Sequence, residues 1–244
     1  MFADAVELGD ALATEILAAY EGAEGRRFLL GCPGGRSLRS TYRALAERRP
    51  DLRRLVVVMM DEYVVDGAPA PPDAPYSCRG FARRELAEPL GLREEQVWLP
   101  DPADPARYDE RIAAAGGVDL FLLASGASDG HVAFIPPGSA REGRTSVVTL
   151  AESTRRDNVA TFSEFASVDD VPRHGVSVGL GTIADARRLR LVLHGEDKRH
   201  AATRLLRLDR FDPRWPASIV HDCAGAEIWL DRAAQPWYGR PWSE

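Results

Sequence analysis

The strongest constraint on the fold is a run of six apolar residues, LVVVMM, from Leu55 to Met60. A strand with one face in water alternates apolar and polar residues, whereas a strand covered by helices on both faces is apolar throughout. A second apolar run extends from Leu120 to Leu123. Both runs predict central strands of a buried parallel sheet.

Strand-like and helix-like segments alternate along the chain, which is typical of an α/β protein. We therefore expect a three-layer αβα sandwich around a mostly parallel, Rossmann-like sheet, with residues 1–244 forming one domain. The proline-rich residues 67–75 are too short for a domain linker but long enough to cover a site. The expected strands are residues 28–30, 55–60, 97–99, 120–123, 146–150, 176–182, 189–193 and 226–230, and the expected helices are residues 3–20, 38–48, 76–90, 105–115 and 198–206.

Composition narrows the class of protein. A length of 244 residues allows a sizeable core, and 45% hydrophobic with 28% charged residues is ordinary for a soluble globular chain. The net charge of −6 argues against nucleic-acid binding. Cys32, Cys78 and Cys223 have no metal or disulfide spacing, which suits a reducing compartment. With no signal peptide or membrane-length apolar segment, we expect a cytoplasmic protein.

Polar residues follow the predicted strands where parallel sheets place ligands. His131, in Asp129-Gly130-His131, is the best candidate general acid/base because imidazole titrates near neutrality, and Asp129 could orient its ring. Asp61 and Glu62 follow the strand that ends at Met60, so a catalytic base is plausible there. Taken singly, each pattern is also typical of a solvated loop or a helix-capping acid.

The turn after the first predicted strand could hold an anion. Gly34 and Gly35 would let backbone N–H groups approach a phosphate, while Arg36 and Ser37 could add donors. A plain strand-to-helix turn uses glycine in the same way. Lys198 lies near a helix start, where the dipole disfavours cations, so a bound anion would compensate; a solvent-facing lysine is the alternative. The P-loop and dinucleotide patterns are absent.

Three motifs follow one another along the chain: PGGRS at 33–37, MDEYV at 60–64 and DGHVAF at 129–134. In this order they resemble the glucosamine-6-phosphate deaminases, which share a group with the 6-phosphogluconolactonases. The lactonases usually continue DGH with TASLFP and carry arginine at the place of Tyr63, so the sequence is more similar to the deaminases at both points. The resemblance covers nearly the whole chain.

The resemblance implies a mechanism without a metal or organic cofactor. His131 would move the ring-oxygen proton and open the sugar, and Asp129 would orient His131. Asp61 would take the C2 proton of the open chain, on the way to a ketose phosphate and ammonia. Lys198 and the glycine turn match the phosphate grip, and Glu62 is a further candidate for substrate binding. The expected partner is a small phosphorylated sugar, and a homo-oligomer is compatible with the sequence.

The sequence departs from the deaminase pattern in four ways. Pro136 stands where the family has a glutamate that completes the histidine relay, so we expect Asp129 or Glu62, or a water on one of them, to orient the ring. Ala160 stands where the family has a substrate-binding arginine. The glycine turn reads PGGRSL where the family has TGGTP, so Arg36 is new and could supply the missing charge. The effector-site cations fall on Ser146 and Val148, so that regulation looks absent.

These departures leave two alternatives to a deaminase. A 6-phosphogluconolactonase-like hydrolase needs the histidine but no C2 base, so loss of the glutamate would reduce its activity less. A catalytically weak sugar-phosphate-binding homologue is the other, although a mere binder has no need to retain Asp61, Asp129 and His131 together.

Overall fold

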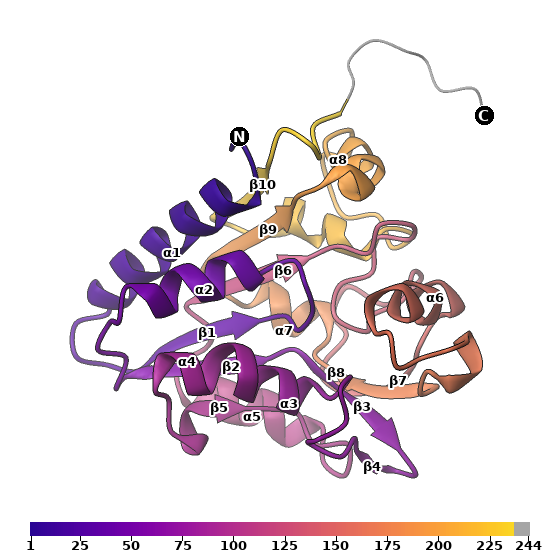
Figure 1. Cartoon of the computed structure of the whole chain (residues 1–244), viewed down its shortest axis with the longest axis horizontal. Helices are drawn as coiled ribbons and strands as arrows, with labels where there is room; N and C mark the ends of the chain where they lie inside the picture. The colour runs from indigo at the N-terminus through magenta and orange to yellow at the C-terminus, as the bar shows by residue number, and fades with distance from the viewer. Residues whose placement is uncertain (237–244) are drawn as a thin grey trace.

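The computed structural model describes residues 1–236 and builds them around a six-stranded parallel sheet (Figure 1). All five residues of β2 are buried, as are the first four of β6, because helices cover both faces. The two apolar runs are therefore central strands, as predicted. In the order β10-β9-β6-β1-β2-β5, the strands are Ala226–Leu230, Leu189–Leu193, Leu120–Ala124, Phe28–Cys32, Leu55–Met59 and Val97–Trp98.

Helices form a layer on each face of this sheet, which confirms the three-layer sandwich (Figure 1). The two hydrophobic cores that result share the strands but draw on different helices. None of the helices in residues 1–236 has the length and apolar character to cross a membrane. One core takes in α1 Ala5–Glu21, α2 Arg39–Glu47, α3 Cys78–Ala82 and the π-helical turn η1 Arg83–Ala87, beyond which α4 Glu88–Leu90 continues; the other takes in α5 Ala106–Ala114, α7 Leu180–Ala184, α8 Arg199–Leu205 and the 3₁₀ segment η5 Pro216–Asp222.

A second, antiparallel sheet was not expected. Residues 146–150 and 176–182 were predicted as strands. In the structure His174–Ser177 pairs antiparallel with the DEYVV segment, Ser146–Thr149 pairs with His174–Ser177, and residues 180–182 instead begin α7. Backbone hydrogen bonding explains the second sheet. The Met60 carbonyl accepts the Val178 N–H, so the chain leaves the main sheet after Met59 and starts a new strand. In the order β4-β3-β8-β7, the strands are Ala68–Pro69, Asp61–Val65, His174–Ser177 and Ser146–Thr149.

The second sheet and helix α6, Glu152–Thr161, lie beyond the carboxyl ends of the central strands. The arrows of the central strands in Figure 1 point toward this side of the molecule. The sequence predicted no helix here, because the low apolar content of α6 gives no helical period. These elements close the space above the strand ends and so position the site.

Candidate active site

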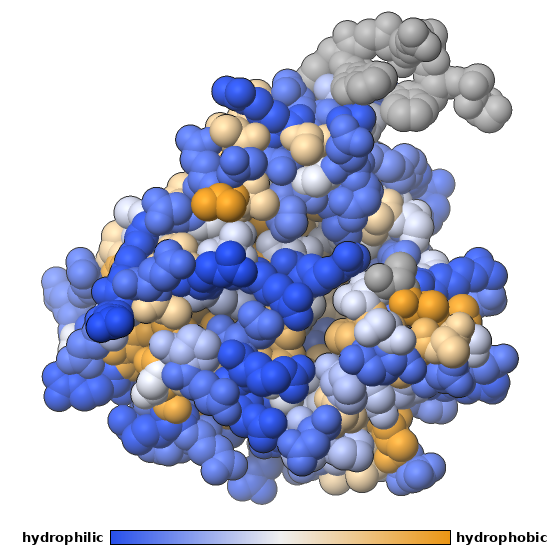
Figure 2. Space-filling view, viewed as in Figure 1, coloured by the Kyte–Doolittle hydropathy of each residue, from blue (hydrophilic) through white to orange (hydrophobic). Residues whose placement is uncertain are grey.

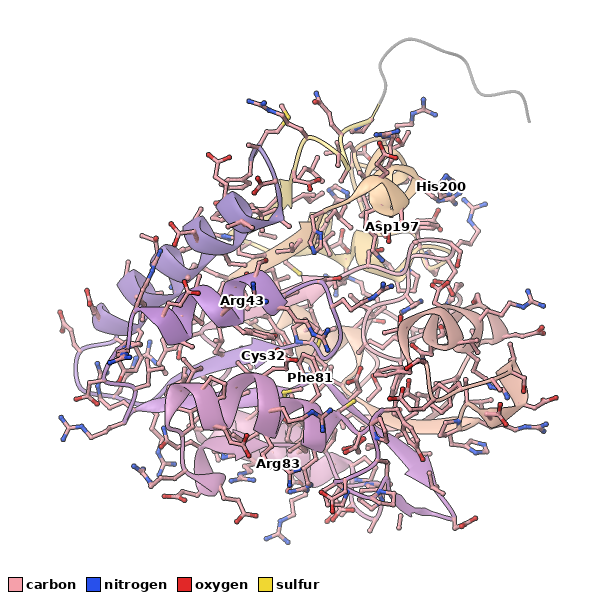
Figure 3. All side chains as sticks on the ribbon, in the orientation of Figure 1. Cys32, Arg43, Phe81, Arg83, Asp197 and His200 are labelled. Atoms are coloured by element: carbon pink, nitrogen blue, oxygen red, sulfur yellow. The ribbon has the colours of Figure 1, made fainter. Side chains whose placement is uncertain are left out.

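The main cleft, of about 730 Å³, opens at the carboxyl ends of the parallel strands. Figure 2 shows the molecule from the same side, where hydrophilic residues dominate the surface. Phe81 of α3 and Asp197 beside α8, both labelled in Figure 3, line the cleft from opposite sides. The predicted site residues that line it are Gly34, Gly35, Arg36, Ser37, Asp61, His131 and Lys198.

Asp61 begins β3 and is 6% exposed. Burial raises the pKa of its carboxyl to about 7, and the thiol of Cys78 and the charge of His131 oppose the rise only in part. A carboxylic acid with this pKa exchanges protons readily near neutrality, as a general base must. Its position on the cleft wall makes it available to a bound molecule.

Asp129 and His131 form a close pair in the loop after β6. The His131 Nδ1 atom lies 2.7 Å from Asp129 Oδ1, which also accepts the His131 backbone N–H at 3.0 Å. Ser153, on α6, donates its hydroxyl to the other carboxylate oxygen. Burial opposes ionisation of Asp129, yet these bonds hold its pKa well below its usual range. An ionised Asp129 places the proton on Nδ1 and leaves Nε2 free to accept one.

Two glycines allow this loop to close. A Cβ atom on Gly126 would lie 2.2 Å from His131 Nδ1, so the imidazole has room only above a glycine. Gly130 has a φ of +69°, and a Cβ there would press on the ring of Trp215. No local sequence pattern marks Gly126, because its role depends on the position that the His131 ring takes in the folded loop.

Glu62 is corrected from a candidate substrate-binding residue to a structural one. Its carboxylate is 1% exposed and accepts the backbone N–H groups of Tyr63, Cys78 and Arg79 at 2.8–2.9 Å. The Ser77 hydroxyl donates to it at 3.1 Å. Neighbouring residues of a strand point to opposite faces, so Asp61 reaches the cleft while Glu62 anchors the start of α3. It therefore cannot orient His131.

The cleft lining also includes Lys198 and the glycine turn. Lys198 donates from Nζ to the Ser125 carbonyl at 2.8 Å, and burial lowers its pKa. His194, at the end of β9, contacts the Ser37 carbonyl through Nε2 at 3.0 Å and so ties the turn to the central sheet. Gly35 has a φ of +85°, which favours glycine and lets the turn bend. Backbone N–H groups and an ammonium here suit an anion.

Several lining residues were not identified from the sequence. Cys78 was considered only as evidence on the redox compartment, and Asp157 lies on α6, a helix that the sequence did not predict. Five aromatic side chains form one wall of the cleft: Tyr63, Tyr76, Phe81, Phe134 and Phe162. This aromatic wall has no sequence signature, because its members come from four separate segments.

The departures from the deaminase pattern lie as follows. Pro136 is not among the described residues that line the cleft, and its carbonyl accepts the Ser139 hydroxyl at 2.7 Å. Ser146 and Val148 lie on the edge strand β7. Ala160 lies outside the residues whose side chains are described.

Comparison with known proteins places these features in context. Residues 3–229 match the family model of glucosamine-6-phosphate isomerases/6-phosphogluconolactonase. A glucosamine-6-phosphate deaminase of Rhodococcus jostii is 41% identical over 217 residues, which cover 84% of this chain and 80% of that protein. The deaminase of Streptomyces avermitilis is 39% identical over 203 residues, covering 79% and 75%.

Solved structures agree with the fold. A monomeric glucosamine-6-phosphate deaminase superposes with a TM-score of 0.85 at 27% identity, over 96% of this chain and 97% of that one. The 6-phosphogluconolactonase of Trypanosoma cruzi superposes with a TM-score of 0.72 at 20% identity, over 96% and 94%. At that identity the second likeness concerns the fold alone.

Proposed function

The chain belongs to the glucosamine-6-phosphate isomerase/6-phosphogluconolactonase family, and we propose that it acts as a glucosamine-6-phosphate deaminase. The observation that carries this proposal is the position of Asp61. A buried carboxyl with a pKa of about 7 shares one cleft with the Asp129–His131 pair. Ring opening and C2 proton abstraction need these two groups, whereas lactone hydrolysis needs no base at C2.

The geometry supports the following sequence of steps. His131 Nε2 takes the proton of the anomeric hydroxyl and returns one to the ring oxygen, so the sugar opens to its aldehyde. Asp61 then takes the C2 proton, and the electron pair moves toward C1 as the carbonyl oxygen gains a proton. Protonation at C1 gives an imine at C2. Water adds to that imine, and ammonia leaves with formation of the ketose phosphate.

The proposal includes the remaining expectations for this chain. Gly34, Gly35, Arg36, Ser37 and Lys198 hold the phosphate, and Arg36 supplies a cation at the rim. Residues 1–244 form one sugar-phosphate domain that works in the cytoplasm, with a small phosphorylated sugar as its partner.

A direct assay tests the proposed function. The protein is incubated with glucosamine 6-phosphate in deuterium oxide, and ammonia release and C2 exchange are followed by NMR. We expect both. Hydrolysis of 6-phosphogluconolactone without C2 exchange on any hexosamine phosphate would identify a lactonase instead, and binding without either reaction would identify a sugar-phosphate-binding homologue.

The phosphate grip leads to a prediction for Lys198, which is the single lysine in the sequence. A hydrogen bond to a charged group contributes about 1.5–3 kcal/mol. Lys198→Ala should therefore raise KM about ten- to a hundredfold and change kcat much less. Initial rates over a range of substrate concentration measure both constants.

Arg53→Ala is the matched control, since Arg53 is an exposed cation that pairs with Asp51 away from the cleft lining. Its KM should equal that of the unmodified protein. A normal KM in Lys198→Ala would show that Lys198 does not hold the phosphate.

A further inference from the structure

We propose that Cys78 is a positioning residue for the C2 base, whose thiol donates a hydrogen bond to Asp61 and favours the ionised carboxylate. The Cys78 Sγ atom lies 3.3 Å from Asp61 Oδ1, within the range of a sulfur hydrogen bond. The inference rests on the proposed role of Asp61 as the base. It assigns a chemical task to a thiol that the steps above do not use.

The start of α3 holds this thiol in place. Ser77 caps the helix by accepting the Gly80 N–H at 3.1 Å, and Glu62 accepts the N–H groups of Cys78 and Arg79. Cys78 is 7% exposed and lines the cleft. Glu62 thus fixes the backbone from which the Cys78 side chain reaches Asp61.

The thiol remains a donor over the whole working range of pH. Burial and the neighbouring carboxylates raise the pKa of Cys78 well above its ordinary value, so the proton stays on sulfur. Burial likewise raises the pKa values of the nearby tyrosines well above their ordinary value, and these side chains stay neutral. The groups that interact electrostatically with Asp61 are Glu62 and Tyr63 on β3, Cys78 on α3, His131 after β6, Tyr42 on α2 and Tyr108 on α5.

A weak donor suits a base at this position. Without any donor, burial and the like charge of Glu62 would raise the pKa of Asp61 still further, and the carboxyl would stay protonated to a higher pH. A strong donor would stabilise the carboxylate so well that it would become a poor base. The S–H group is the weakest of the common side-chain donors, so it corrects the burial only in part.

The experiment is a direct titration of Asp61. The protein is labelled with ¹³C at the aspartate carboxyl carbons, and the Asp61 signal is assigned with Asp61→Asn. We expect the pKa of Asp61 to rise by about 0.5 to 1 pH unit in Cys78→Ala. In Cys78→Ser the hydroxyl restores a donor, so the pKa should return to the wild-type value or fall below it.

Cys223→Ala is the matched control. Its thiol contacts the Ile219 carbonyl at 3.1 Å and does not line the cleft, so the Asp61 pKa should stay unchanged. Cys78→Val fills the volume of the thiol without a donor and replaces the alanine variant should that one fail to fold. The acid limb of the pH profile of C2 exchange should move with the NMR pKa in each variant.

The outcomes separate the two proposals. An Asp61 pKa in Cys78→Ala or Cys78→Val equal to the wild-type value overturns the role of Cys78, even while C2 exchange proceeds. Absence of C2 exchange in the wild-type protein overturns the proposed function. The NMR titration then still decides whether Cys78 controls the ionisation of Asp61.

Discussion

Asp61→Asn is expected to reduce exchange of the C2 proton with deuterium by about 10²–10⁴-fold, the usual contribution of a positioned general base. An amide has nearly the shape of the carboxyl but no basic oxygen, so the cleft should still bind substrate. NMR detection of the C2 signal measures exchange, and calorimetric titration measures binding.

Asp66→Asn makes the same chemical change in the exposed turn after β3, in a residue that does not line the cleft. This control should retain exchange. Exchange that survives in Asp61→Asn at the wild-type rate would remove Asp61 from the mechanism, and dispensability of Asp61 together with lactone hydrolysis would identify a lactonase.

The same substitution should change how stability depends on pH. The folded-state pKa of Asp61 is about 7, raised by burial from the ordinary value of 3.8. Between about pH 4 and pH 7 the unfolded chain ionises this group while the folded protein keeps it protonated, so wild-type stability falls as pH rises through that window. Asparagine does not ionise, so the variant does not lose stability in this way as pH rises. Asp61→Asn should therefore unfold at a higher temperature than wild type at pH 8, with the difference shrinking toward pH 4.

His131→Ala is expected to lower turnover by about 10²–10⁴-fold, because ring opening loses its acid/base. Steady-state ammonia release measures the effect. Asp129→Asn should lower turnover by a smaller factor. The amide cannot hold the proton on His131 Nδ1 as the ionised carboxylate does at 2.7 Å.

His174→Ala serves as the control for the imidazole itself, because His174 is exposed on β8 and does not line the cleft. Its turnover should match wild type. A His131→Ala variant with normal turnover would contradict both the deaminase and the lactonase mechanisms, since both use this histidine.

The sequence by itself determined the central sheet and the polar strand ends. Continuous apolar runs such as Leu55 to Met60 occur in water-soluble chains where both faces of a strand are covered, so they indicate a parallel sheet without further information. Parallel strands share one carboxyl edge, which is why Gly34, Gly35 and His131 could be expected in one place. The family motifs depend only on the order of residues along the chain, so they too could be recognised from the sequence.

Only the tertiary structure decided which partners the acidic residues take. Asp61 and Glu62 are adjacent in sequence, but their carboxylates take different partners: Asp61 lines the cleft beside the Cys78 thiol, whereas Glu62 accepts the backbone N–H groups at the start of α3. The pairing of β3 with β8 is a long-range choice, made by backbone hydrogen bonds that no local pattern encodes. The thiol of Cys78 and the turn of His131 onto Asp129 depend on those placements, because side-chain contacts follow from the packing of distant segments.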